Sequence, residues 1–237
     1  MRRLVAATVL ACSLIGAGAS GSPAYPGCAS GPDLHFRAAD GTRLVGHRFG
    51  HGKTAVVLAH QYGGDVCEWA PYAGRLASLG YTAIAFDFRG FGLSQHRTGE
   101  ALIRYDQDVV AAARLARTQG AARVILVGAS IGANAVVVAG AEAKPPVDGV
   151  VSLSAPATFR LDAVSAAKRL KVPVLYVAGT IDEGGIYRQD ARTLYTATAA
   201  ADKAITLVPT AEHGVQLVGH PGKVRTQVER FLRAHSH

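Results

Sequence analysis

Hydrophobic and polar positions alternate near the start of the chain. Residues 34–49 read "LHFRAADGTRLVGHRF", which is two alternating stretches around Asp40 and Gly41. Such alternation predicts strands with one covered face, and Asp-Gly between two such stretches favours a two-residue hairpin turn. We therefore expect an antiparallel hairpin at the front of the fold.

After Gly52 the pattern changes to short, continuous apolar runs, which are typical of strands buried on both faces. Segments with helical spacing separate these runs, and this alternation predicts a parallel sheet covered on both sides. The expected fold is a single α/β domain, with a mostly parallel sheet, the hairpin at its N-terminus and helices on both faces. The runs span residues 54–60, 81–88, 122–129, 147–155, 172–179 and 204–209, and the helical segments span 67–80, 101–120, the residues after Ser130, part of 157–171, 185–201 and 222–235.

The composition narrows the classes of function. The 237 residues are 49% hydrophobic, which is enough for the core of one domain. The net charge is +8, but the basic residues are scattered, so they predict a solvated surface and no nucleic-acid partner. No metal-ligand cluster is evident, and no phosphate-binding glycine motif follows the first buried strand, so we expect neither metal nor cofactor.

The first residues resemble an export signal. Arg2 and Arg3 precede an apolar stretch, and Ala17-Gly18-Ala19 forms a small-x-small cleavage site. We predict a secretion signal over residues 1–19, a mature N-terminal segment over 20–32 and a catalytic domain over 33–237. The protein is then secreted or periplasmic, with no membrane span after cleavage, because the apolar stretch is shorter than the roughly 20 residues that a span requires. A lipoprotein acylated at Cys12 is the alternative.

Export also changes the interpretation of the cysteines. Removal of the signal leaves Cys28 and Cys67, an even number in an oxidising compartment. We hypothesise that they form a disulfide between the mature N-terminal segment and the first helix after Gly52. Two unpaired thiols are the alternative.

A Gly-x-Ser-x-Gly motif follows the third apolar run. Ser130 stands between Gly128 and Gly132, directly before a stretch rich in small residues. A sharp turn from a buried strand into a helix strains the backbone at the serine, and the glycines let the two elements approach closely. This context predicts that Ser130 is a nucleophile rather than part of an ordinary turn.

A serine nucleophile needs a base, and the base needs a carboxylate that orients it. Of the nine histidines, His213 directly follows the last apolar run and is the predicted base. Asp182 follows the fifth run and is the predicted acid, with Glu183 and Asp162 as alternatives. The loops beyond the carboxyl ends of the strands are where such sheets hold their ligands, so these positions fit a shared site.

The order of serine, aspartate and histidine along the chain is that of the α/β-hydrolase superfamily. Over residues 33–236 the chain resembles a lidless serine esterase of this superfamily, similar to dienelactone-hydrolase-like bacterial enzymes. "LAHQYGG" (58–64) resembles the family's His-Gly loop, and "FDFRGFGLS" (86–94) resembles its Asp-x-Arg-Gly-x-Gly-x-Ser turn, which we interpret as scaffold. Some relatives carry the acid one strand earlier, where this chain offers only Ala157 and Thr158.

The resemblance implies an oxyanion hole made by the backbone N–H groups of Tyr62 and Ile131. The chain departs from the family in having Gln61, where glycine is common. Dienelactone hydrolases proper have a cysteine in place of Ser130, so their substrate is not carried over. No insertion is present between 156 and 172, which leaves no room for a cap domain.

These features predict an exported serine hydrolase that cleaves carboxylic esters or thioesters through an acyl-enzyme. A peptidase or amidase with the same three residues is one alternative, and a catalytically silent binding protein is the other. An open site favours short or compact acyl groups, because each methylene left in water forgoes about 0.8 kcal/mol of burial. The expected partner is a small ester, and the oligomeric state is left open. The aromatic residues expected near the mouth are Tyr62, Trp69, Phe91 and Tyr187.

Overall fold

A computed structural model describes residue 25, residues 27–30 and residues 33–237. The secretion signal predicted over 1–19 and most of the segment predicted over 20–32 lie outside the described residues. The described residues form an eight-stranded sheet in the order β1-β2-β4-β3-β5-β6-β7-β8. The strands are β1 (Leu34–Arg37), β2 (Arg43–Phe49), β3 (Thr54–Ala59), β4 (Thr82–Phe86), β5 (Arg123–Ala129), β6 (Gly149–Leu153), β7 (Val174–Gly179) and β8 (Lys203–Val208).

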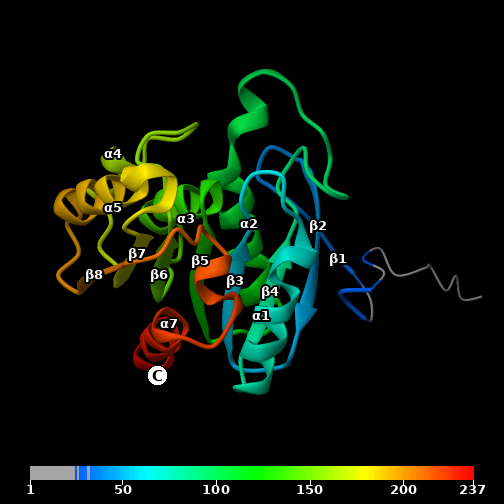
Figure 1. Cartoon of the computed structure of the whole chain (residues 1–237). Coiled ribbons are helices and arrows are strands. Elements are labelled where there is room, and N and C mark those ends of the chain that lie inside the picture. Colours follow the sequence, from blue (N-terminus) through cyan, green and yellow to red (C-terminus); the bar gives the residue numbers. More distant parts are fainter. Residues whose placement is uncertain (1–24, 26, 31–32) are drawn as a thin grey trace, which may run out of the picture.

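The predicted α/β fold is confirmed. Strands β3 to β8 pair in parallel, whereas β2 is antiparallel to both β1 and β4 and extends the sheet at one edge. Helices cover both faces (Figure 1). The helices are α1 (Val66–Ser78), α2 (Tyr105–Thr118), α3 (Ile131–Glu142), α4 (Ala163–Ala167), α5 (Ile186–Ala197), α6 (Gln216–Gly219) and α7 (Lys223–Ala234), with 3-10 turns η1 (Gly99–Ile103) and η2 (Asp182–Gly185).

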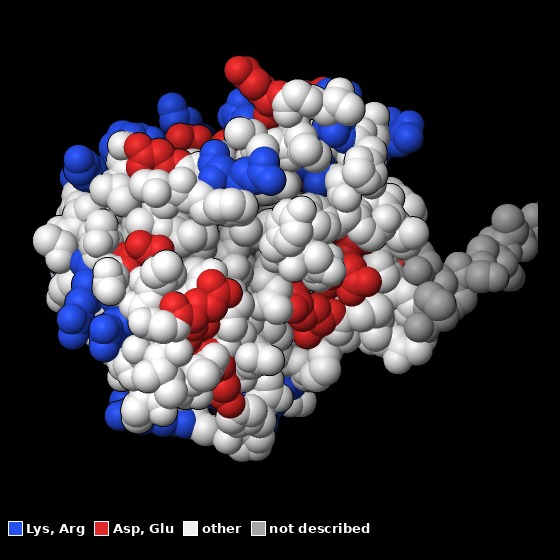
Figure 2. Space-filling model, turned by 45° about the horizontal axis from the view of Figure 1, so that its top comes forward, with Lys and Arg blue, Asp and Glu red and all other residues white. Residues whose placement is uncertain are grey.

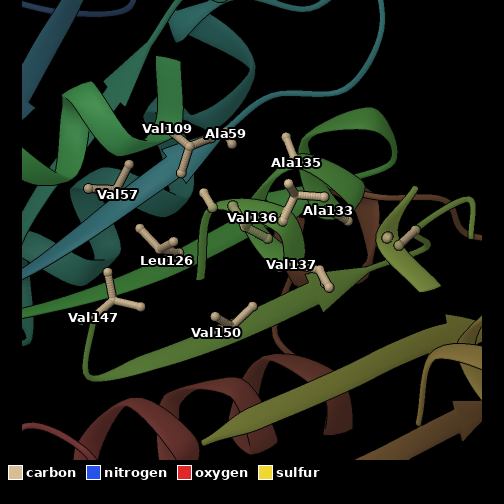
Figure 3. Packing of buried hydrophobic residues seen from close by; sticks show 14 of the residues in the cluster. Val57, Ala59, Val109, Leu126, Ala133, Ala135, Val136, Val137, Val147 and Val150 are labelled. Carbon is tan, nitrogen blue, oxygen red and sulfur yellow. The ribbon is translucent and has the colours of Figure 1, made fainter. Parts of the chain in front are cut away.

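Side chains of β3 show why the strands read as continuous apolar runs. Val57 and Ala59 belong to the hydrophobic cluster that contains residues of α2 to α5. Val56 and Leu58 belong to the opposite cluster, which contains residues of α1, α6 and α7. Both faces of the strand are therefore buried, and the run from Ala55 to Ala59 is continuously apolar. Figure 3 shows the first cluster, with Val57, Val109, Leu126, Val136 and Val150 between the sheet and its helices.

The N-terminal hairpin forms as predicted, but its turn does not. Arg37 pairs with Arg43, so five residues connect β1 to β2 instead of a two-residue turn. The reason is the side chain of Asp40, whose Oδ1 accepts hydrogen bonds from the N–H and the hydroxyl of Thr42 at 3.0 and 2.7 Å. The Thr42 carbonyl still accepts from the Ala38 N–H at 3.0 Å, but the Thr42 N–H is diverted to Asp40, and the turn widens.

The predicted disulfide is confirmed: the structure joins Cys28 to Cys67, with their Cα atoms 5.3 Å apart. Cys67 lies in the first turn of α1, so the bond ties the chain before β1 to this helix. The hydroxyl of Tyr25 donates to Asp87 at 2.8 Å and makes a second attachment nearby. The chain before β1 is therefore fastened at two points close to the start of α1.

The residues after β4 act as scaffold, in keeping with the interpretation of the Asp-x-Arg-Gly turn. Arg89 is fully buried, and its guanidinium pairs with Asp108 of α2 and with Asp40, in each case at 2.7 Å. Charges without water need such partners on every side. Helix α2 begins at Tyr105 rather than at residue 101, because η1 comes first and Arg104 departs from helical geometry.

Candidate active site

Ser130 occupies the turn between β5 and α3. Its backbone has a φ of 52°, a region that residues with a side chain rarely adopt. A Cβ on Gly128 would collide with the Gly132 carbonyl, and a Cβ on Gly132 would collide with the Ala59 carbonyl. The two glycines therefore allow strand and helix to meet at the serine. The Ser130 N–H donates to Leu153 of β6 at 2.9 Å, which fastens the turn to the sheet.

His213 and Asp182 meet beside this turn. His213 follows β8, and its Nδ1 lies 2.9 Å from Oδ2 of Asp182, which follows β7. The side chain of Asp182 is 2% exposed, whereas that of His213 is 23% exposed. A buried carboxylate can only accept here, so Nδ1 carries the proton and Nε2 keeps its lone pair. The Asp182 carboxylate thus orients the imidazole through Nδ1, and Nε2 is left to accept a proton.

A cavity of about 470 Å³ brings Ser130 and His213 together at the carboxyl ends of the strands. Its size lies at the small end of the range for ligand pockets. Asp182 is not part of the wall and lies behind His213, as an orienting acid does. The residues that line the cavity are Gln61, Tyr62, Ser130, Ile131, Pro156, Phe159, Arg160, Glu183, Tyr187 and His213.

Tyr187 of α5 covers the imidazole on one side. The ring centroids of Tyr187 and His213 are 4.5 Å apart, with 53° between the planes. Burial raises the pKa of Tyr187, Glu183 and Asp182 raise it further, and the Ser130 hydroxyl acts in the opposite direction. Tyr187 therefore brings a protonated hydroxyl to the space that Ser130 occupies.

Two backbone N–H groups are free at the cavity wall. Tyr62 lies in the loop after β3, and Ile131 is the first residue of α3, where a helix leaves its N–H groups unpaired. Among the described residues, neither N–H donates a hydrogen bond to a protein atom. The resemblance implied these two groups as an oxyanion hole, and the structure places both beside Ser130 on the same cavity.

Comparison with known proteins agrees with this geometry. A family model described as serine aminopeptidase, S33, matches residues 50–163, a stretch that includes Ser130 and ends before Asp182 and His213. An esterase from Pyrococcus furiosus has a TM-score of 0.76 and 17% identity, with 87% of this chain and 93% of that chain covered. A thermophilic esterase from Thermogutta terrifontis has a TM-score of 0.71 and 15% identity, with 87% and 100% covered. These likenesses show that the chain has the α/β-hydrolase fold.

A third similar structure is a Butyrivibrio proteoclasticus protein with ferulic acid bound. It has a TM-score of 0.66 and 14% identity, and 85% of this chain and 99% of that chain are covered. No curated protein matches the sequence. The narrower likeness to dienelactone-hydrolase-like enzymes stays a prediction, since none of these findings tests it.

The loop that carries Tyr62 is held by a buried histidine. His60 is 0% exposed, its Nδ1 lies 2.7 Å from the Gln61 carbonyl, and its Nε2 lies 3.0 Å from the Phe88 N–H. A carbonyl accepts and an N–H donates, so His60 is the neutral tautomer with its proton on Nδ1. The Glu68 carboxylate supports the same loop and accepts from the Gln61 N–H at 3.3 Å.

Acidification is expected to destabilise the fold through His60. Burial lowers its pKa from 6.5 to about 4, so between these values the unfolded chain binds a proton that the folded chain does not. The stabilisation is complete above pH 6.5 and is lost as the pH falls toward 4, by about 3 kcal/mol from this residue. Urea unfolding at a series of pH values measures the slope, which should be shallower in His60→Gln.

The exposed His35 on β1 provides the control. His35→Gln should keep the wild-type dependence of unfolding free energy on pH. If His60→Gln also keeps it, His60 is charged in the folded protein and its assignment as the neutral tautomer is wrong.

Several expectations about the site need correction or addition. Trp69 was expected at the mouth, but it is 0% exposed and packs in the core below α1, because it lies on the inner face of that helix. Asp162, an alternative acid, instead caps α4 by accepting from the Ser165 N–H at 2.9 Å. No sequence motif pointed to Ser154, whose hydroxyl donates to Asp182 at 2.9 Å.

Charges of both signs lie at the candidate site, where Arg160 and Glu183 line the cavity. Figure 2 turns the end of the molecule that carries the site forward, and acidic and basic side chains are interspersed over the part of the chain it describes. Within residues 25, 27–30 and 33–237, no group of three or more histidine, cysteine, aspartate and glutamate side chains is placed to hold a metal ion. No helix in the described part of the chain has the length and apolar character that a membrane crossing requires.

Proposed function

We propose that the chain is an exported serine hydrolase that cleaves carboxylic esters or thioesters of short or compact acyl groups. One observation carries the proposal: Ser130 shares a cavity with His213, whose Nδ1 is bonded to the buried carboxylate of Asp182 at 2.9 Å. That constellation activates a serine hydroxyl, which is a weak nucleophile by itself. The likeness to esterases supports an ester as substrate.

In the proposed reaction Ser130 Oγ attacks the acyl carbon and His213 Nε2 takes its proton. Asp182 holds the imidazole in the tautomer that can accept, and it stabilises the imidazolium that forms. Collapse of the tetrahedral intermediate expels the alcohol or thiol, which receives the proton from His213. Water then attacks the acyl-enzyme with the same proton transfers and releases the acid.

The intermediate places a negative charge on the former carbonyl oxygen. The N–H groups of Tyr62 and Ile131 are the donors we assign to this oxygen, because both residues line the cavity and neither N–H has a protein partner in the part of the chain that the structure describes. Each donor of this kind contributes roughly 3 kcal/mol to transition-state stabilisation. His60 fixes the carbonyl of Gln61, and so holds the peptide that precedes Tyr62.

Apolar side chains around the opening favour a compact acyl or aryl group. Tyr62 and Phe159 line the cavity and are 63% and 46% exposed. Tyr62 contacts the ring of Phe91 edge-on at 5.4 Å, and Tyr187 closes the side next to His213. The segment from β6 to α4 covers only residues 154–162, so it adds no cap over the serine. A long chain would lie largely in water.

The ester series from p-nitrophenyl acetate to palmitate tests the proposal. We expect kcat/KM to be largest for short chains, because the cavity fills quickly and each further methylene forgoes about 0.8 kcal/mol of burial. Initial rates of p-nitrophenolate release measure it, with the Ser130→Ala protein as the blank for uncatalysed hydrolysis. A steady rise toward palmitate would contradict the open, shallow site.

Peptide or amide cleavage is the second candidate, and the serine aminopeptidase family model favours it. The same three side chains would serve, but the leaving amine needs a proton before it departs. Comparing p-nitrophenyl acetate with aminoacyl p-nitroanilides separates the two activities. A higher kcat/KM for the anilides would replace the esterase by an aminopeptidase.

The signal-like pattern over residues 1–19 supports export. The disulfide between Cys28 and Cys67 fits an oxidising compartment, because such bonds are rare where thiols are kept reduced.

A further inference from the structure

Ser154 makes a buried connection behind the site. It follows β6 and is 0% exposed. Its hydroxyl donates to Oδ2 of Asp182 at 2.9 Å and accepts from the N–H of Gly214 at 3.2 Å. One side chain therefore contacts both the predicted acid and the residue next to the predicted base.

The two contacts determine the direction of the hydroxyl. An N–H can only donate, so Gly214 occupies a lone pair of Ser154 Oγ, and the single hydroxyl proton is left for the carboxylate. Oδ2 of Asp182 is also the oxygen that accepts from His213 Nδ1 at 2.9 Å. Ser154 and His213 thus donate to the same oxygen, and this oxygen cannot rotate away without losing both bonds.

The backbone at Ser154 is unusual in the same sense as that of Ser130. Its φ is 53°, a conformation that glycine adopts at far lower cost. Among the described residues, the other non-glycine residues with positive φ are Ser130, Arg160 and Glu183, and all three line the cavity. Strained backbone gathers where function requires a particular geometry.

We propose that Ser154 is a positioning residue of the triad, which fixes the carboxylate of Asp182 toward His213 and ties the loop of His213 to the sheet. This inference rests on the proposed function of Ser130, Asp182 and His213. Ser154 does not touch the cavity and takes no proton from substrate. It acts by holding Asp182 and His213 in the relative positions that their hydrogen bond requires.

Loss of the hydroxyl has two consequences. Asp182 loses a donor and gains freedom to rotate, which misaligns the base and lowers kcat. Without the Ser154 donor, Oδ2 of Asp182 interacts more strongly with His213 and stabilises the imidazolium. A higher pH is then needed to form the neutral imidazole that accepts the serine proton. The other charged or titratable groups around His213 are Glu68 from α1, Tyr187 from α5, and Glu183 and Arg160 at the cavity wall, and a change at 154 leaves all four in place.

The test compares Ser154→Ala with Ser152→Ala. Ser152 is a buried serine of β6, two residues before Ser154, and its hydroxyl donates to the Ala133 carbonyl at 3.4 Å, away from Asp182. In Ser154→Ala we expect kcat for p-nitrophenyl acetate to fall about ten-fold with KM within two-fold of wild type. The acidic limb of the kcat/KM profile should move to higher pH. Ser152→Ala should change neither.

Ser154→Gly separates positioning from folding. Glycine also lacks the hydroxyl, but it relieves the positive φ, so its Tm should equal or exceed that of Ser154→Ala. We expect the same ten-fold loss of kcat in both variants. Full activity of Ser154→Gly would reduce Ser154 to a structural residue and overturn the proposal.

A ¹H NMR measurement tests the role of Ser154 independently of the proposed reaction. The Nδ1–H of His213 gives a downfield resonance in ¹H NMR when it is bonded to a carboxylate, and this needs no substrate. We expect the resonance in wild type, in Ser152→Ala and in Ser130→Ala, and a shifted or exchange-broadened one in Ser154→Ala. An unchanged resonance together with an unmoved acidic limb overturns the role of Ser154. If the wild type hydrolyses no ester but Ser154→Ala still shifts or broadens the resonance, only the esterase function is contradicted.

Discussion

Replacing Ser130 by alanine is expected to lower kcat for p-nitrophenyl acetate by about 10⁵-fold and to abolish labelling by a fluorophosphonate. The variant lacks the only protein atom that forms a covalent bond to the acyl group in the proposed reaction. Alanine adopts the φ of 52° at the same cost as serine, so the fold should persist. Labelling, turnover and Tm measured on one preparation check all three statements.

Ser152→Ala is the matched control, because it removes a hydroxyl from the neighbouring strand β6. It should keep both labelling and turnover. If Ser130→Ala were still labelled at the wild-type rate, another residue would be the nucleophile. If the wild type were neither labelled nor active, the chain would be a binding protein on an α/β-hydrolase scaffold.

Asp182→Asn is expected to lower kcat by about 10⁴-fold. The amide that replaces the carboxylate can present an NH₂ group to His213 Nδ1, which favours the tautomer with its proton on Nε2. That tautomer cannot accept the proton of Ser130. The imidazolium also loses its negative partner, which lies 2.9 Å away in the wild type. Steady-state kinetics and circular dichroism on the purified variant measure the loss and verify the fold.

Two other carboxylates test whether the position is specific. Asp162 caps α4, and Asp162→Asn should leave kcat near the wild-type value. Glu183 lines the cavity next to Asp182, and Glu183→Gln should cost less than ten-fold, because its carboxylate makes no bond to His213. A loss of 10⁴-fold in Glu183→Gln with an active Asp182→Asn would transfer the role of the acid to Glu183.

Local chemistry along the chain was sufficient for much of the fold. The runs that became β3 to β8 could be identified because a sheet covered on both faces selects mostly apolar side chains at successive positions. The turn at Ser130 could be identified because Gly128 and Gly132 are needed wherever a strand and a helix meet so closely. These features depend on neighbours within a few residues.

Other features depended on contacts between distant residues. The pattern predicted a two-residue hairpin turn at Asp40 and Gly41. In the structure the Asp40 side chain instead bonds to Thr42 and pairs with Arg89, which lies far along the chain. Trp69 was predicted to lie at the mouth of the site. It instead lies on the inner face of α1 and packs in the core. Neither outcome is encoded in the periodicity of the segment itself.

The sequence by itself determined the α/β class, the strand-to-helix turn at Ser130 and the order of the three chemical groups. The tertiary structure alone decided that Asp182 reaches His213, that Tyr62 and Ile131 open onto one cavity, and that Ser154 lies between acid and base. The physical reason is the distance along the chain over which each kind of interaction acts. Periodicity and turn chemistry act over a few residues, whereas Ser154 and Asp182 become neighbours only because β6 pairs with β7, and this pairing is set by the packing of the whole sheet.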